Sequence, residues 1–282
     1  MFTHNFKEVV SRYKAVFLDS FGVLRNHQGI IPGIDQTLKF LIDQKIEYFL
    51  LTNDASRSPE QLAQHYKNRG IHDISAEQII SSGMLAREYL QYQIKTGTVA
   101  YLGTEDSAHY IETNGLRTLS IHDLHLHQID DVVALVFLDD EGFDWNHDIN
   151  KAINLLRIKN MPVIVANTDV AYPVSRHEIA VATGAIADMV EAIVGKRFIR
   201  FGKPDAQMFM FAYEMLQAKG HFKKNDLLMV GDTLDTDIIG GNKFGIDTVL
   251  VLSGNTLAHK AELHIESSGI IPTYICEAAV LK

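Results

Sequence analysis

The sequence predicts an α/β fold: a doubly wound parallel sheet with a second, smaller α/β domain inserted into it. Short apolar runs rich in Val, Ile, Leu and Phe alternate with helical patterns along the chain, as in sheets buried on both faces. The pattern occurs in an N-terminal block and a C-terminal block. A third block between them follows the same pattern but is interrupted by polar, His-rich sequence.

The N-terminal block predicts two parallel strands joined by a helix. Residues 15–18 and 48–51 are buried-strand patterns, and Ile34, Leu38 and Leu41 between them recur at helical spacing. A second helix is expected to begin after Ser58, because a serine cap followed by proline and, three residues after the cap, glutamine is typical of a helix start. We expect that helix to end at Gly70.

The C-terminal block repeats this order. The pattern predicts a helix at 206–219, a strand at 227–230, a helix at 235–244 and a strand at 248–252. The two outer blocks are therefore expected to form one discontinuous, Rossmann-like core.

The middle block predicts a separate α/β unit. Strands are expected at 99–102, 132–137 and 163–166, and helices at 106–113 and 146–159. The His-rich stretch 121–127 occurs only here. We therefore predict a core domain made of 1–81 and 199–282, and an inserted cap domain at 82–198.

Composition excludes several classes of protein. The 282 residues carry 26 basic and 35 acidic side chains, a net charge of −9 that disfavours nucleic acids and anionic membranes as partners. The longest apolar run, 132–138, is too short to span a bilayer. With no signal-peptide pattern and a single cysteine, Cys276, the chain is expected to be cytoplasmic, without an intrachain disulfide or a paired-cysteine zinc site.

Polar residues that could carry chemistry follow the predicted core strands. Asp19, Thr52 with Asn53, and Asp232 with Asp237 follow strands, while Lys203 comes just before the predicted helix at 206–219. Ligands of open parallel sheets bind at the carboxyl ends of the strands, so these side chains are expected to share one crevice. A nucleophilic carboxylate, a hydroxyl and an amide for phosphate oxygens, a lysine, and further carboxylates for a hard cation together suit phosphoryl transfer.

The order and spacing of these motifs resemble the haloacid dehalogenase superfamily. Asp19 lies in an hhhhDxxG segment, Thr52 is the hydroxyl motif, Lys203 is the lysine motif, and Asp232 and Asp237 lie in GDxxxTD. The long gap between Thr52 and Lys203 is where class II caps are inserted in that superfamily. The flanking sequences look like its NagD-like class IIA branch.

The resemblance implies a role for each motif. Asp19 would attack phosphorus and form an aspartyl-phosphate, Thr52 and Asn53 would hold phosphate oxygens, and Lys203 would neutralise charge. Mg²⁺ would be held by Asp19, the backbone carbonyl of Phe21 and Asp232, with Asp237 behind them. The inserted domain would contact the leaving group of a small phosphorylated metabolite through Asn167, Thr168 and Asp169. Cap surfaces in resembling proteins often pair, which leaves a homodimer as an open alternative.

Phe21 departs from the pattern. Most phosphatases of this superfamily carry an aspartate two residues after the nucleophile, which protonates the leaving oxygen and later activates water. A positioned proton donor is worth about 10²–10⁴ in rate. Three alternatives follow: an activated leaving group, an acid from elsewhere such as Asp54 or His27, or a phosphoryl acceptor other than water.

Two functions of different class remain open from the sequence. The first is a magnesium-dependent phosphatase acting on a sugar phosphate or nucleotide. The second is a phosphate-ester-binding or regulatory protein with weak or no turnover. The histidines at 122, 125, 127, 147 and 177 could suggest a transition-metal cluster, but their spacing favours a solvated surface.

Overall fold

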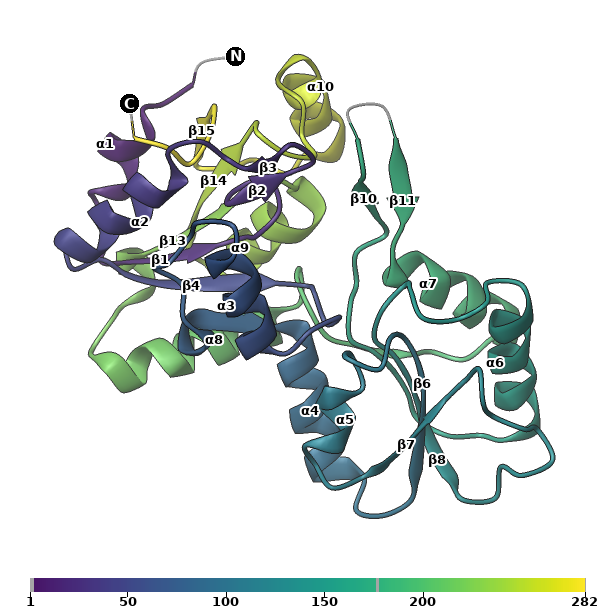
Figure 1. The fold of residues 1–282 in the computed structure, drawn as a ribbon. Coiled ribbons are helices and arrows are strands. Elements are labelled where there is room, and N and C mark those ends of the chain that lie inside the picture. Colours follow the sequence, from purple (N-terminus) through teal and green to yellow (C-terminus); the bar gives the residue numbers. More distant parts are fainter. Residues whose placement is uncertain (1–2, 176–177, 282) are drawn as a thin grey trace. The chain divides into compact units, whose positions relative to one another are not determined.

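The chain packs as two compact units in this computed structural model, which describes residues 3–175 and 178–281 (Figure 1). The core unit comprises Met1–Thr52, Pro59–Ile80 and Lys203–Lys282, and the inserted unit comprises Asn53–Ser58 and Ser81–Gly202. Both units are α/β with parallel main sheets, so the predicted fold class is confirmed. No helix among the described residues is long and apolar enough to cross a membrane.

The core unit is built on a six-stranded sheet. Its helices and strands are α1 (Phe6–Val10), β1 (Ala15–Leu18), β2 (Arg25–Asn26), β3 (Gly29–Ile30), α2 (Ile34–Asp43), β4 (Glu47–Thr52), α3 (Pro59–Lys67), β5 (Ile79–Ser81), α8 (Ala206–Lys219), β13 (Leu227–Gly231), the π-helix Leu234–Ile238, α9 (Ile239–Phe244), β14 (Asp247–Val251), α10 (Ala258–Ser268) and β15 (Tyr274–Cys276). The strand order is β15-β14-β13-β1-β4-β5. The strand order therefore reverses between β1 and β13, which pair in parallel.

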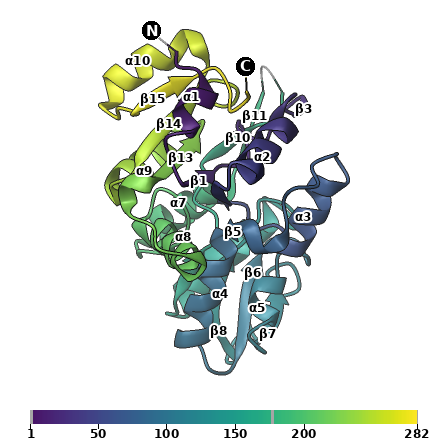
Figure 2. The ribbon, with the colours of Figure 1, turned by 90° about the vertical axis from the view of Figure 1, so that its left-hand side faces the viewer.

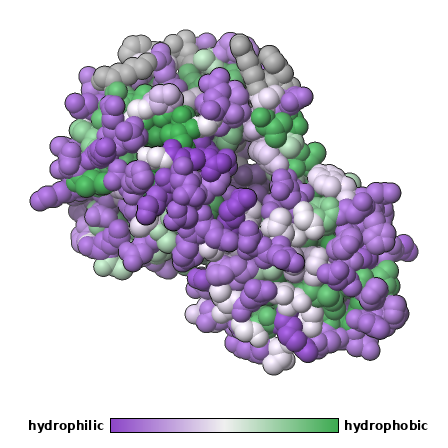
Figure 3. All heavy atoms as spheres, in the orientation of Figure 1, coloured by the Kyte–Doolittle hydropathy of each residue, from purple (hydrophilic) through white to green (hydrophobic). Residues whose placement is uncertain are grey.

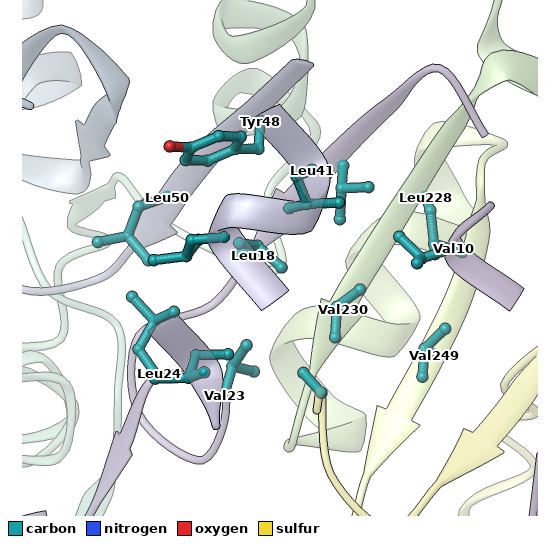
Figure 4. Packing of buried hydrophobic residues seen from close by; sticks show 14 of the residues in the cluster. Val10, Leu18, Val23, Leu24, Leu41, Tyr48, Leu50, Leu228, Val230 and Val249 are labelled. Atoms are coloured by element: carbon teal, nitrogen blue, oxygen red, sulfur yellow. The ribbon is translucent and has the colours of Figure 1, made fainter. Parts of the chain in front are cut away.

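Alternate residues of the core strands face two layers of helices. Leu18, Leu50 and Val230 pack on one face against α1, α2 and α3 (Figure 4). Met229 lies on the other face, where the adjoining helices are α8 and α9, and a Cβ built on Gly241 of α9 comes within 3.2 Å of it. Figure 2 shows α2 and α9 on opposite sides of β1 and β13. This arrangement is the doubly wound core that the apolar runs predict.

Local sequence sets the ends of several helices. Helix α8 has the predicted bounds, and the Asp205 side chain caps it by accepting a hydrogen bond from the Gln207 N–H. Helix α3 begins at Pro59 as predicted but ends at Lys67, and Gly70 lies in the following turn with a φ of +92°. The segment predicted as one helix over 235–244 begins as a π-helix before α9.

The inserted unit has its own five-stranded sheet. Its elements are α4 (Ser82–Gln93), β6 (Thr98–Leu102), α5 (His109–Glu112), β7 (Arg117–Ser120), β8 (Val132–Phe137), α6 (His147–Ile158), β9 (Val163–Val165), β10 (Ala171–Pro173), β11 (Ile179–Val181), α7 (Thr183–Val194) and β12 (Ile199–Arg200). The order β12-β9-β8-β6-β7 is parallel throughout, and α6 and α7 pack together beside it. Helix α5 is shorter than the 106–113 predicted, because a turn occupies 105–108.

One loop of the N-terminal block belongs to the inserted unit. Residues 53–58 were predicted within the core domain, yet they pack with the inserted unit. Ser82 Oγ donates to the Asn53 carbonyl at 2.9 Å, and Tyr110 Oη donates to the Arg57 carbonyl at 2.7 Å. The predicted boundaries at 81/82 and 198/199 remain a prediction. The visible face of the chain is largely hydrophilic, with scattered apolar patches (Figure 3).

Candidate active site

The candidate site lies where the strand order of the core sheet reverses. Asp19 follows β1 and Asp232 follows β13, and the Asp19 N–H donates to the Val230 carbonyl at 2.9 Å. Asp237 comes from the π-helix that β13 leads into. Crevices at such reversals are where open α/β sheets bind their ligands.

Three carboxylates and one ammonium group meet there. Ligand oxygens of Asp19, Asp232 and Asp237 all lie within 4.8 Å of one another, the only such group among the residues that the structure describes. Lys203 Nζ lies 2.5 Å from Asp19 Oδ1 and 2.7 Å from Asp237 Oδ1, and it donates to the Leu51 carbonyl at 2.9 Å. Four of the predicted residues, Asp19, Lys203, Asp232 and Asp237, are therefore brought together.

Burial and mutual repulsion shift the acidities of this group. Burial, and next the charge of Asp237, raise the pKa of Asp232 to about 7. Burial and the charge of Asp237 also raise the pKa of Asp19, although Lys203 opposes the rise. Burial alone would lower the pKa of Lys203, but the carboxylates of Asp19 and Asp237 raise it above its usual value. Three acidic side chains thus face a single lysine, and the site has too little positive charge to balance them.

The donor set fits a hard divalent cation. Carboxylate oxygens are the ligands that Mg²⁺ prefers, and a cation among them would relieve the repulsion that raises the pKa values. The Phe21–Gly22 segment lies against these acids, since a Cβ built on Gly22 would come 2.3 Å from Asp232 Oδ2. The role of the Phe21 backbone carbonyl as a ligand stays a prediction.

A loop that sequence reasoning missed holds Asp232 in place. Asn255 donates its backbone N–H to Asp232 Oδ2 at 2.5 Å, while Thr233 Oγ1 donates to Asp232 Oδ1 at 2.9 Å. Ser253 Oγ donates to the Gly22 carbonyl at 2.5 Å. A Cβ built on Gly254 would lie 1.9 Å from Asp232 Oδ2. This loop directly follows β14, so the rule applied to the other strands could have found it.

Thr52 and Asn53 are neighbours in sequence but belong to different units. Thr52 ends β4 and is buried in the core unit. Asn53 Nδ2 donates to Thr168 Oγ1 at 3.0 Å and to Asp169 Oδ1 at 2.8 Å, within the inserted unit. Asn167 is also there, and its Oδ1 accepts from the Asp169 N–H at 2.9 Å. Asn53 thus joins the predicted leaving-group residues of the inserted unit.

The departure at Phe21 brings an arginine to the nucleophile loop. The Arg25 guanidinium lies over the Phe21 ring, 6.0 Å from its centroid. Both side chains are half-buried. No sequence motif predicts this pair, because it depends on a tight turn that places Phe21 and Arg25 side by side.

Two of the cap histidines bind a buried carboxylate. His122 Nδ1 and His147 Nδ1 lie 2.9 Å and 2.8 Å from the oxygens of Asp148, which is fully buried. Burial favours the neutral acid, but hydrogen bonds from the Asp144 N–H and both imidazoles hold the pKa of Asp148 well below its usual range. Within the described residues these histidines form no metal cluster, and His177 lies outside them.

Family models match both outer parts of the chain. The model described as "Haloacid dehalogenase-like hydrolase" matches residues 16–117, and a model described as "HAD-hyrolase-like" matches residues 200–278. These matches include every predicted core motif from Asp19 to Asp237.

Known proteins match over most of their length. Dihydroxyacetone phosphatase from Corynebacterium glutamicum is 32% identical over 236 residues, 84% of this chain and 80% of that protein. The crystal structure of a "possible sugar phosphatase, HAD superfamily" from Cytophaga hutchinsonii is 53% identical, with a TM-score of 0.96 over 100% of this chain and 99% of that chain. Glycerol phosphate phosphatase from Mycobacterium tuberculosis, in complex with magnesium, shares the fold at 24% identity, with a TM-score of 0.77 over 99% of this chain and 78% of that chain.

Proposed function

Because the chain belongs to the haloacid dehalogenase-like hydrolases, we propose that it is a magnesium-dependent phosphatase acting on a small phosphate ester. One observation carries the proposal. Asp19 lies at the strand reversal with Lys203 Nζ 2.5 Å from its Oδ1, beside two fully buried carboxylates. A structural lysine–aspartate pair alone would not need the two further acids.

The chemistry assigned to the chain's own residues is a double displacement. Asp19 attacks phosphorus, a bond forms between its carboxylate oxygen and phosphorus, and the bond from phosphorus to the ester oxygen breaks. Water then attacks the aspartyl-phosphate, releasing inorganic phosphate and restoring the carboxylate. Lys203 keeps its positive charge beside Asp19 throughout, because its raised pKa holds the proton. Thr52 is assigned to a phosphoryl oxygen.

Magnesium is the proposed cofactor. Asp19, Asp232 and the Phe21 carbonyl would bind it, with Asp237 orienting the group through Lys203 and through its Oδ2, which accepts from the Thr233 N–H at 3.1 Å. When bound, Mg²⁺ supplies positive charge that lets the nucleophile and the phosphoryl group approach each other.

Phe21 restricts the leaving group in this proposal. A phenyl ring cannot donate a proton, so the ester oxygen must leave without help from this position. Aryl phosphates, whose phenolate leaves readily, are expected to react faster than alkyl phosphates. Phe21→Asp is expected to raise alkyl ester hydrolysis by up to about 10²–10⁴-fold. A folded variant with no gain would count against this assignment.

The substrate class is proposed from relatives and from the inserted unit. Two of the similar proteins are named "Dihydroxyacetone phosphatase" and "possible sugar phosphatase", and phosphate esters of such compounds are small and polar. Asn167, Thr168 and Asp169, with Asn53, offer amide, hydroxyl and carboxylate groups that could recognise the hydroxyls of such a leaving group. We assign leaving-group contacts to them.

The test is magnesium-dependent phosphate release from 4-nitrophenyl phosphate and glucose 6-phosphate, measured side by side. Asp19→Asn is the control for the nucleophile, and Asp205→Asn, which changes the exposed cap of α8, is the matched control for loss of an acid. Release of phosphate by the wild type and the Asp205 variant, but not by the Asp19 variant, is expected.

The pattern across the two esters decides between functions. Faster cleavage of the aryl ester places the protein among phosphatases restricted to activated leaving groups. Equal cleavage means that another residue supplies the proton. If neither ester reacts while both bind with magnesium, the binding or regulatory function, which Phe21 favours, replaces the enzyme.

A further inference from the structure

Within the described part of the chain, Arg25 is a cation without a carboxylate partner. Among residues 3–175 and 178–281, no acid lies within ion-pair distance of its guanidinium, which lies over the Phe21 ring. Arg25 is half-buried and so is not simply a solvated surface side chain. Stacking on an aromatic face is a geometry that leaves the N–H groups of a guanidinium edge available for a ligand.

The backbone of Arg25 is fixed beside the nucleophile. Its N–H donates to the carbonyl of Ser20, the residue after Asp19, at 3.3 Å. Its own carbonyl accepts from the Gly22 N–H at 2.6 Å. The next residue, Asn26, donates from Nδ2 to the carbonyl of Ser253 at 3.3 Å. The turn that carries Arg25 is therefore tied both to the nucleophile loop and to the loop that holds Asp232.

The charges of the site leave Arg25 unused. Three carboxylates are matched by Lys203 and one divalent cation, and Lys203 already contacts two of those carboxylates and a carbonyl. Because Lys203 contacts the nucleophile Asp19, we assign the transferred phosphoryl group to Lys203 and the metal and not to Arg25. A second cation on a separate turn fits a substrate that carries a second anionic group.

We propose that Arg25 binds an acidic group on the leaving part of the substrate, so that the protein prefers phosphate esters that also carry a carboxylate or a second phosphate. Guanidinium groups bind carboxylates and phosphates through paired N–H donors, which gives both charge and geometry. This inference rests on the proposed function, because it names the substrate class of the same site.

The experiment compares two esters that differ in one group. Glycerol 3-phosphate carries a hydroxymethyl group where 3-phosphoglycerate carries a carboxylate. We would measure kcat/KM for both with saturating Mg²⁺ in the wild type, Arg25→Gln and Arg12→Gln. Arg12 is the matched control, because its guanidinium lies 5.9 Å from the centroid of the Tyr274 ring elsewhere in the core unit.

The wild type is expected to favour 3-phosphoglycerate by about 10- to 100-fold, the range for one charge-assisted hydrogen-bond pair. Arg25→Gln should reduce this preference to about one, and Arg12→Gln should retain it. A preference unchanged in Arg25→Gln overturns the proposal. So does an equal loss with both esters, which would mean that Arg25 binds the transferred phosphoryl group.

Binding separates this inference from the proposed function. If no ester is hydrolysed, the phosphatase assignment fails, and calorimetric titration of the two esters into the magnesium-loaded protein then decides about Arg25. Tighter binding of 3-phosphoglycerate that is lost in Arg25→Gln supports the acidic subsite. Equal binding of both esters overturns it.

Discussion

A methyl group added at Gly254 should disable the proposed metal site without replacing any of its proposed ligands. The Cβ of Gly254→Ala would lie 1.9 Å from Asp232 Oδ2 and 2.5 Å from the Gly22 Cα. Ordinary van der Waals contact begins near 3.4 Å, so carboxylate and loop must separate by roughly 1.5 Å. Because the loop also donates the Asn255 N–H to Asp232, moving it releases the carboxylate as well.

The expected loss follows from the geometry that Mg²⁺ requires. Its bonds to oxygen are about 2.0–2.1 Å long in a nearly ideal octahedron, so a displacement of this size removes Asp232 from productive coordination. Changes to residues that orient metal ligands cost about 10- to 100-fold in affinity, and we expect Gly254→Ala to reach that range. Isothermal titration of Mg²⁺ into the apoprotein measures it directly.

The control variant is Gly220→Ala. Gly220 has extended backbone, with a φ of 168°, and its Cβ would come no closer than 3.3 Å to the edge of the Phe222 ring. It should bind Mg²⁺ like the wild type. A folded Gly254→Ala variant, shown by an unchanged circular dichroism spectrum, that binds Mg²⁺ within about twofold of the wild type would refute the reasoning.

Two further predictions concern stability. Lys203→Met should lower the free energy of unfolding by about 3–5 kcal/mol at pH 8, because it leaves buried carboxylates unpaired. Mg²⁺ should restore part of this in urea titrations, and Lys219→Met, which breaks an exposed pair with Glu47, should cost under about 1 kcal/mol. Equal losses of unfolding free energy in Lys203→Met and Lys219→Met would contradict the argument. Burial and the charge of Asp140 raise the pKa of Asp139 to about 6, so its charged form destabilises the fold as pH rises from about 4 to 6. The melting temperature of Asp139→Asn, measured relative to that of the wild type, should therefore rise across that interval. A difference in melting temperature that stays constant with pH would argue against the raised pKa of Asp139.

Much of the core could be predicted because local patterns decide it. The bounds of α8 follow from its apolar content and the Asp205 cap, and β1 and β8 are short apolar runs typical of buried strands. Asp19 and Asp232 could be grouped because parallel strands end at the same edge. These inferences needed no knowledge of which strands are neighbours.

Other features depend on contacts between distant segments. Gly254 matters only because β14 lies next to β13, which brings its loop onto Asp232. The packing of 53–58 with the inserted unit depends on hydrogen bonds from Ser82 and Tyr110. The Arg25–Phe21 pair depends on the geometry of one turn. In each case the sequence contains the residues but does not show which other residues they contact.

The reversal of strand order also bears on how the chain is made. β1 pairs with β13, and Ala15 lies opposite Leu227, so the central strands of the core sheet are separated by most of the polypeptide. The strands of the inserted sheet all lie between Thr98 and Arg200, and that unit can therefore fold on the ribosome before β13 is synthesised. Until then β1 and β4 expose an apolar edge that invites aggregation. A chaperone that holds nascent chains is expected to bind the first fifty residues. A chain truncated before β13 should contain a folded insert and an unfolded N-terminal segment.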